Sequence, residues 1–68
     1  MERVVIKVGG MSCQGCVKNV GGVLQALPGV GEVSVSLEAG EAAVAYDPAQ
    51  VTVAALRAAI EDAGFDAA

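Results

Sequence analysis

Residues 32–46, EVSVSLEAGEAAVAY, contain two runs of alternating side chains separated by a short turn. Alternation with a period of two is typical of a strand with one buried face. The inward-facing residues are Val33, Val35 and Leu37 in the first run and Ala42, Val44 and Tyr46 in the second. Glu38-Ala39-Gly40 supplies a loop in which Gly40 can take a positive φ. The stretch therefore predicts a β-hairpin.

The residues before this hairpin predict one strand and one helix. Residues 3–8 alternate, and the inward face of that strand consists of Val4, Ile6 and Val8. An apolar stripe with helical spacing follows, formed by Val17, Val20, Leu24 and Leu27. Pro28-Gly29 is a stop signal, so we expect the helix to end there.

The residues after the hairpin predict a second helix and a short strand. Thr52 suits the N-cap position, and Gly64 suits the end of the helix. The apolar stripe between them is formed by Val53, Leu56 and Ile60. Residues 65–68 predict the start of a last strand.

The order strand, helix, strand, strand, helix, strand predicts an α+β fold. Two strand–helix–strand crossovers joined by a hairpin form the ferredoxin-like βαββαβ sandwich, with two helices on one face of a four-stranded antiparallel sheet. With 68 residues, of which 54% are hydrophobic, we expect residues 1–68 to fold as a single domain. A chain this short leaves no room for a large cleft and a separate cofactor domain, which argues against an elaborate enzyme.

Charge and composition exclude several kinds of partner. Eight acidic residues against four basic ones give a net charge of −4, and one Tyr and one Phe offer no platform for stacked bases, so we expect no nucleic-acid binding. No apolar run approaches the ~18 residues of a membrane span, so we expect no membrane insertion. Met1-Glu2-Arg3 lacks the features of a signal peptide, and we expect a cytoplasmic protein.

The chemistry is concentrated in the loop Gly10-Met11-Ser12-Cys13-Gln14-Gly15-Cys16. Two sulfurs three residues apart can turn toward one point, and we expect Gly15 to permit the bend. Cys16 falls in the first helical turn, where free N–H groups favour an anion, so at least one thiol pKa should be lowered. With no His and no third Cys the cage is incomplete for zinc or an iron–sulfur cluster. Soft, low-coordinate ions remain, Cu(I) first, with Ag(I) and Hg(II) as chemical mimics.

The residues around the two cysteines have simpler interpretations. We expect Met11 to be a core plug that holds the loop in place, in preference to a third, thioether ligand. Ser12 and Gln14 are expected to be solvated spacers, and Phe65 a core aromatic beside the second helix. Lys7 and Lys18 are the cations expected near the loop.

Residues 10–16 resemble the G-M-x-C-x-x-C signature of the heavy-metal-associated domain family. The resemblance extends along nearly the whole chain, through Leu27-Pro28-Gly29-Val30, Ala45-Tyr46-Asp47-Pro48 and Ile60-Glu61-Asp62-Ala63-Gly64-Phe65. It implies the βαββαβ fold and Cu(I) held by Cys13 and Cys16. It also implies a metallochaperone that delivers copper, by thiolate ligand exchange, to the metal-binding domain of a copper-transporting P-type ATPase.

Several alternatives accompany this hypothesis. Family members also occur as N-terminal modules of such ATPases, and Phe65 is closer to the modules than to the free chaperones. A carrier of another soft metal such as Hg(II) is a second alternative. A dithiol–disulfide oxidoreductase would also place a C-x-x-C at a helix N-terminus, but the aromatic and Pro residues usual around that motif are missing, so we expect no enzyme. A metal-bridged homodimer, in which two copies share one ion, is a further expectation.

Overall fold

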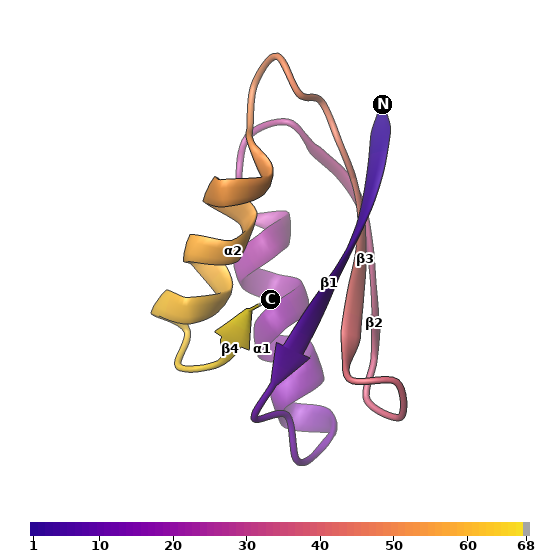
Figure 1. Cartoon of the computed structure of the whole chain (residues 1–68), viewed down its shortest axis with the longest axis vertical. Coiled ribbons are helices and arrows are strands. Elements are labelled where there is room, and N and C mark those ends of the chain that lie inside the picture. The colour runs from indigo at the N-terminus through magenta and orange to yellow at the C-terminus, as the bar shows by residue number, and fades with distance from the viewer. Residues whose placement is uncertain (68) are drawn as a thin grey trace.

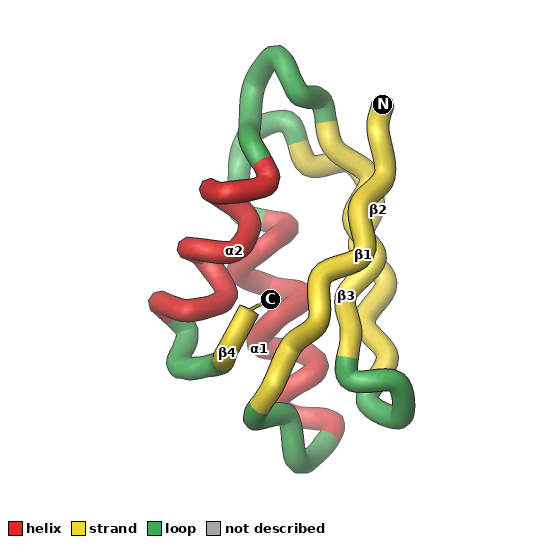
Figure 2. The backbone as a smooth tube through the Cα atoms, in the orientation of Figure 1, coloured by secondary structure: helices red, strands yellow, loops and turns green. Residues whose placement is uncertain are grey.

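The computed structural model describes residues 1–67 as a single sheet covered by two helices (Figure 1). The elements in chain order are β1 (Glu2–Gly9), α1 (Gln14–Gln25), β2 (Val30–Ser36), β3 (Glu41–Tyr46), α2 (Val53–Asp62) and β4 (Asp66–Ala67). The strands lie in the order β2-β3-β1-β4 with antiparallel neighbours. Both helices lie on the same face of the sheet (Figure 2). The predicted ferredoxin-like architecture is confirmed.

The core lies between the helices and the sheet, and the predicted alternation accounts for most of it. Its fully buried side chains include Ile6 from β1, Val20 and Leu24 from α1, Val44 from β3, and Leu56 and Ile60 from α2. Val51 is also buried. It lies in the segment that leads into α2 and belongs to no periodic run, so the alternation does not account for it. The core therefore holds both helices against the central strands of the sheet.

Two element boundaries differ from the sequence prediction. The α1 helix ends at Gln25, so Leu27 packs against the core from outside the helix. The Leu27 N–H donates to the Leu24 carbonyl at 3.1 Å, which tightens the last turn, and a residue that precedes a proline disfavours the helical region. The second strand spans Val30–Ser36, and Leu37 lies in the turn. Gly40 takes a φ of +64°, as the hairpin required.

The second helix begins and ends as predicted. The Thr52 hydroxyl accepts a hydrogen bond from the Ala55 N–H at 3.2 Å, and Gly64 follows the helix with a φ of +96°. The last strand pairs with β1 at Val8 and Gly9, while Ala68, which the prediction included, lies outside the described residues. No helix of residues 1–67 combines the length and apolar character needed to cross a bilayer.

The β1–α1 loop, the α2–β4 turn and the β2–β3 turn lie at the same end of the molecule (Figure 1). The β1–α1 loop is the one that carries both cysteines. The fold therefore presents the cysteines at an end of the sheet, away from the middle of the core.

Candidate metal centre

The two cysteines lie side by side where α1 begins. Cys13 is the N-cap residue in an extended conformation, with φ −157° and ψ 172°, and Cys16 lies in the first turn of the helix. Their Sγ atoms are 3.7 Å apart, and both residues are free thiols. Cys13 is exposed and Cys16 partly exposed. The predicted convergence of the two sulfurs is therefore present.

Local hydrogen bonds hold the pair in this arrangement. The Cys13 carbonyl accepts from the N–H groups of Cys16 at 3.1 Å and Val17 at 3.3 Å, which starts the helix at the N-cap. The Cys13 side chain makes no capping hydrogen bond with the first turn. Its sulfur instead lies 3.7 Å from the Cys16 sulfur and is exposed, while the backbone hydrogen bonds hold the two residues at the start of α1.

The glycine that takes a left-handed backbone conformation in this loop is Gly10 and not Gly15. Gly15 lies in α1 and is not among the glycines with positive φ, so the expectation that it permits the bend is wrong. Gly10 has a φ of +93°, a region that L residues with side chains disfavour. The chain turns from β1 toward the cysteines at Gly10, and the helical backbone then brings the sulfurs together.

The site lowers the pKa of the Cys16 thiol below the usual value of 9.0. Hydrogen bonding to the Ser12 backbone is the main cause, and the neighbouring Cys13 thiol adds to it. The predicted lowering of one thiol pKa is confirmed, although the Lys18 ammonium is not among its causes. The lower pKa favours the thiolate, which is the form that binds metal.

Ser12 contributes more than the solvated spacer that the sequence predicted. Its Oγ lies 4.0 Å from the Cys16 Sγ, and its backbone supplies the largest effect on the Cys16 pKa. The residue type alone gave little signal, because the backbone of Ser12 lowers the Cys16 pKa most and the Ser12 side chain only adds to it. Its position immediately before a helix N-cap was the available clue.

Met11 and Phe65 support the loop from the core side. Both are partly buried and pack against the core cluster, which agrees with the prediction that Met11 is a plug. The Phe65 Cδ1 lies 3.7 Å from the point where a Cβ on Gly10 would stand. Phe65 therefore packs beside the turn that leads into the loop with the two cysteines.

The cations expected near the loop have different surroundings. The Lys7 ammonium forms an ion pair with the Glu41 carboxylate at 2.9 Å, between β1 and β3. Lys18 is exposed on α1, two residues after Cys16. Of the two, Lys7 is therefore already engaged within the sheet.

The donor set is limited to sulfur. Within residues 1–67 no group of three or more His, Cys, Asp or Glu side chains is positioned to hold a metal ion. Two thiols on a surface loop fit a soft ion of low coordination number better than zinc, whose structural sites use four ligands. The arrangement defines a small α+β domain with an exposed dithiol site.

Comparison with known proteins assigns this domain to a family. The model of the heavy-metal-associated domain matches residues 5–66, and the chain belongs to that family. The copper chaperone CopZ of Bacillus subtilis (strain 168) is 47% identical over 68 residues, which cover 100% of this chain and 99% of CopZ. The resemblance drawn from the cysteine loop is thereby confirmed.

Parts of much larger proteins match equally well. Copper-transporting ATPase 2 of Homo sapiens is 45% identical over 66 residues, which cover 97% of this chain but 4% of the ATPase. The crystal structure of a copper binding domain from HMA7, a P-type ATPase, superposes with a TM-score of 0.98 at 37% identity, covering 100% of this chain and 92% of that one. The chain thus corresponds to a small part of ATPase 2 and to nearly the whole of the isolated HMA7 domain.

Proposed function

We propose that this chain is a copper chaperone that carries Cu(I) on Cys13 and Cys16 and passes it on by exchange of thiolate ligands. The observation that carries the proposal is the exposed sulfur pair, 3.7 Å apart, at the start of α1. The match to CopZ over the full length of both chains supports copper as the cargo. The soft sulfur donors support the monovalent ion.

The spacing of the sulfurs leaves room for a third ligand. With metal–thiolate bonds of about 2.3 Å, sulfurs 3.7 Å apart would subtend an angle of about 107° at the ion. The side of the ion opposite the protein would then face solvent, because Cys13 is exposed. An ion held in this way remains accessible to a thiolate of another protein.

Transfer then proceeds without release of a bare ion. An incoming thiolate binds Cu(I) while both original sulfurs are still attached, and one original metal–sulfur bond then breaks. A second incoming thiolate displaces the remaining cysteine, so that two thiolates bind and two leave, and each released thiolate can take up a proton from water. No electron is transferred, so copper remains Cu(I) throughout and the dithiol remains reduced.

The natural recipient of such an ion is a second dithiol domain, and we infer that it is the metal-binding domain of a copper-transporting ATPase. The match to ATPase 2 and to the HMA7 domain supports this inference, because donor and recipient would have the same fold and ligands. A metal-bridged homodimer would be the same intermediate formed between two copies. Exchange requires reduced thiols, which points to a reducing compartment such as the cytoplasm.

The test is anaerobic titration with Cu(I) followed by transfer. We expect one tightly bound Cu(I) per chain, sulfur–copper bonding in X-ray absorption spectra, and loss of both in the double variant Cys13→Ser/Cys16→Ser. Gln14→Ala is the matched control, because Gln14 is exposed between the two cysteines and its replacement keeps both thiols. Copper should pass from the loaded protein to a separate ATPase metal-binding domain on mixing.

Other results would assign a different role. Equally tight Cu(I) binding by the double variant would show that these sulfurs are not the site. Preferential binding of Zn(II) or Hg(II) in competition with Cu(I) would assign another cargo. Catalysed reduction of insulin disulfides well above the rate with free dithiothreitol would support an oxidoreductase, and we expect none.

A further inference from the structure

The two cysteines can react with each other as well as with a metal ion. Cys13 and Cys16 are free thiols, and their Sγ atoms lie 3.7 Å apart. A disulfide bond is about 2.05 Å long, so the two sulfurs have to approach by about 1.7 Å to form one. Oxidation of the pair therefore needs only a small movement at the start of α1.

The backbone already holds the pair at a separation that a disulfide can span. The Cys16 N–H donates to the Cys13 carbonyl at 3.1 Å. A hydrogen bond between residues three apart is typical of a tight turn, which keeps the two Cα atoms within about 7 Å, and disulfides join Cα atoms about 4.4–6.8 Å apart. The bond can therefore form with the backbone of the first turn in place.

The Cys13 side chain is free to make the movement. Cys13 is the N-cap residue of α1, but its side chain makes no capping hydrogen bond that would have to break. Cys13 is exposed and Cys16 is partly exposed, so a small molecule can reach the pair from solvent.

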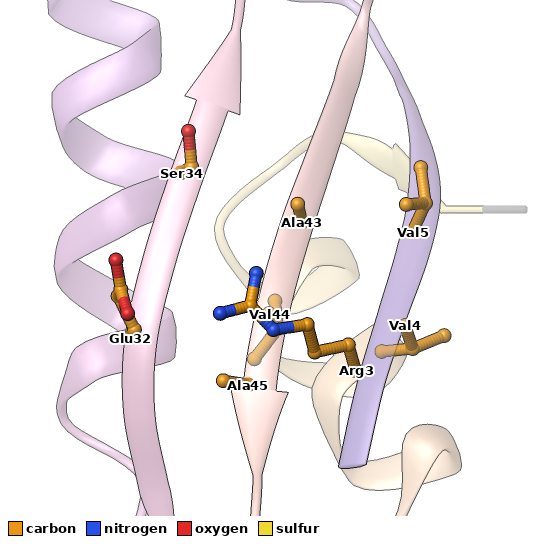
Figure 3. Close-up of a pocket in the computed structure, with 8 residues that line it drawn as sticks. All are labelled: Arg3, Val4, Val5, Glu32, Ser34, Ala43, Val44 and Ala45. Atoms are coloured by element: carbon orange, nitrogen blue, oxygen red, sulfur yellow. The ribbon is translucent and has the colours of Figure 1, made fainter. Parts of the chain in front are cut away.

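The surroundings of the pair indicate which oxidants it can meet. A hollow of about 180 Å³ lies between β1, β3 and β2, and its lining includes Arg3 and Glu32 but neither cysteine (Figure 3). The thiols stand instead where the β1–α1 loop meets α1, at the end of the molecule. An exposed pair does not select one oxidant by shape, so we assign a chemical class, the low-molecular-weight disulfides such as glutathione disulfide.

We propose that Cys13 and Cys16 form a disulfide reversibly by exchange with such a molecule, and that this oxidation switches copper binding off. The second part rests on the proposed function, because it takes these two sulfurs as the copper ligands. Thiolates bind metal, and a disulfide has no thiolate to offer. Each chain then carries either copper or the disulfide, and the thiol–disulfide balance of the surroundings sets the share of chains that can be loaded.

The exchange proceeds in two steps. One cysteine thiolate attacks a sulfur of glutathione disulfide, the S–S bond of that molecule breaks, and one glutathione leaves as a thiolate that takes up a proton. The other cysteine thiolate then attacks the cysteine sulfur of the mixed disulfide, and the second glutathione leaves in the same way. The dithiol loses two electrons and two protons, and glutathione disulfide gains both and becomes two thiols.

Equilibration of the metal-free protein in mixtures of reduced glutathione and glutathione disulfide tests the first part. We expect half of the chains to be oxidised at a balance between those that half-oxidise glutaredoxins and thioredoxin, which also use Cys-X-X-Cys pairs. Mass spectrometry after acid quenching and alkylation should show the loss of two hydrogens per chain. Glutathione disulfide does not oxidise thioethers, so Met1 and Met11 do not contribute. The proposal is overturned if the pair stays reduced at the more oxidising balance of the endoplasmic reticulum.

Single variants separate the two steps of the exchange. Cys13→Ser and Cys16→Ser each leave one thiol without a neighbour, so both should stop at the mixed disulfide and carry one glutathione. Ser34→Cys in the Cys13→Ser/Cys16→Ser background is the matched control, because it places a lone thiol at an exposed position of β2 and should also stop there. If the wild type accumulated mixed disulfide as these variants do, its two sulfurs would not reach each other and the proposal would fail.

Copper binding by the oxidised protein tests the second part. The oxidised chain, freed of glutathione, should bind no Cu(I) in anaerobic competition with a chelator, and dithiothreitol should restore one ion per chain. Loading with Cu(I) beforehand should protect the pair from glutathione disulfide. The switch is refuted if the oxidised wild type binds Cu(I) as tightly as the reduced one while Cys13→Ser/Cys16→Ser does not. Tight binding by that double variant as well would refute the proposed function, and the switch with it, whereas the glutathione equilibrium judges the disulfide independently.

Discussion

The two helices begin with the same backbone shape and opposite chemistry. Thr52 and Cys13 are both extended N-cap residues, with φ values of −107° and −157°. The Thr52 hydroxyl accepts from the Ala55 N–H at 3.2 Å. The Cys13 thiol makes no such bond and faces the Cys16 thiol at 3.7 Å instead.

This difference means that α1 lacks a stabilising capping hydrogen bond that α2 has, and that a pair of thiols takes its place. A side-chain oxygen at the N-cap satisfies one of the free N–H groups of the first turn and typically stabilises by about 1 kcal/mol. At α1 that contribution is absent, and the start of the helix holds two sulfurs. The start of α2 thus contributes a capping hydrogen bond to folding stability, whereas the start of α1 holds the two thiols.

Cys13→Ser should give α1 the kind of cap that α2 has and produce the largest effect. The introduced hydroxyl can cap α1 as Thr52 caps α2, so we expect the metal-free protein to gain about 0.5–1 kcal/mol of unfolding free energy. Cu(I) affinity should fall by more than the ~100-fold that loss of an outer-shell partner costs, because a ligand itself is lost. Competition with a Cu(I) chelator and urea unfolding measure the two quantities.

Cys13→Ala is the control for this prediction. It also removes a sulfur but offers no oxygen to the helix, so it should lose metal affinity without gaining stability. Equal stabilities of the Cys13→Ser and Cys13→Ala proteins would contradict the capping argument. Unchanged copper affinity in either variant would contradict the assignment of Cys13 as a ligand.

Glycine substitutions on the two sides of Cys13 should act in opposite directions. Gly10→Ala forces a side chain into a φ of +93°, which should cost about 1–2 kcal/mol. Gly15→Ala places a Cβ in ordinary contact, 3.6 Å from the Cys13 Sγ, and should stabilise α1 by about 0.5–1 kcal/mol. Thermal unfolding of the metal-free variants measures both. A destabilised Gly15→Ala protein would revive the idea that the bend depends on Gly15.

Thr52→Ala should destabilise the start of α2, because it removes the capping hydroxyl. Loss of the cap should cost about 1 kcal/mol and lower the unfolding temperature by roughly 4–8 °C. Cu(I) affinity should not change, because α2 contributes no ligand. Thr52→Ser retains the oxygen and should be close to wild type. If Thr52→Ala altered copper affinity as much as stability, the separation of roles between the two helices would be wrong.

Much of the fold was predictable because apolar periodicity follows from burial. The alternation in residues 32–46 predicted β2 and β3, and the Thr52 and Gly64 signals located α2. Leu27 was wrongly assigned to the first helix, because an apolar side chain can pack against the core from a helix or from the segment that follows it. Pro28, the next residue, was the signal that its backbone leaves the helix.

The pairing of the two sulfurs was predictable from the sequence, and the contacts that support the pair were less so. The spacing of Cys13 and Cys16 indicated the sulfur pair, but the backbone of Ser12 influences Cys16 through a hydrogen bond that no residue type encodes. Which side chains are neighbours across the sheet depended on register as well. Arg3 and Glu32 are far apart in sequence, and only their shared pairing with Ala45 places them in one row.

The smallest expected effect is a pH dependence that falls in one range for the turn that leads into α2 and in another for the start of α1. Asp47, in the turn before α2, has its pKa lowered below 3.8 by the Gln50 side chain and the Ala49 N–H. Cys16 has its pKa lowered below 9.0 by the Ser12 backbone and the Cys13 thiol. In each case the unfolded chain holds its proton more tightly, so stability rises with pH between the folded and unfolded pKa values.

The two contributions are therefore separated by pH. The Asp47 contribution is present above pH 3.8 and is lost as the pH falls through its folded pKa, and Asp47→Asn should remove that acid-side loss. The Cys16 contribution is complete above pH 9.0 and is lost as the pH falls through its folded pKa. Cys16→Ser should flatten the alkaline rise and leave the acid side unchanged, as measured by urea unfolding of metal-free protein across the pH range. If the unfolding free energy of Cys16→Ser still rose with pH on the alkaline side, another group would titrate in that range. The lowered pKa of Cys16 would then not explain the pH dependence of stability at the start of α1.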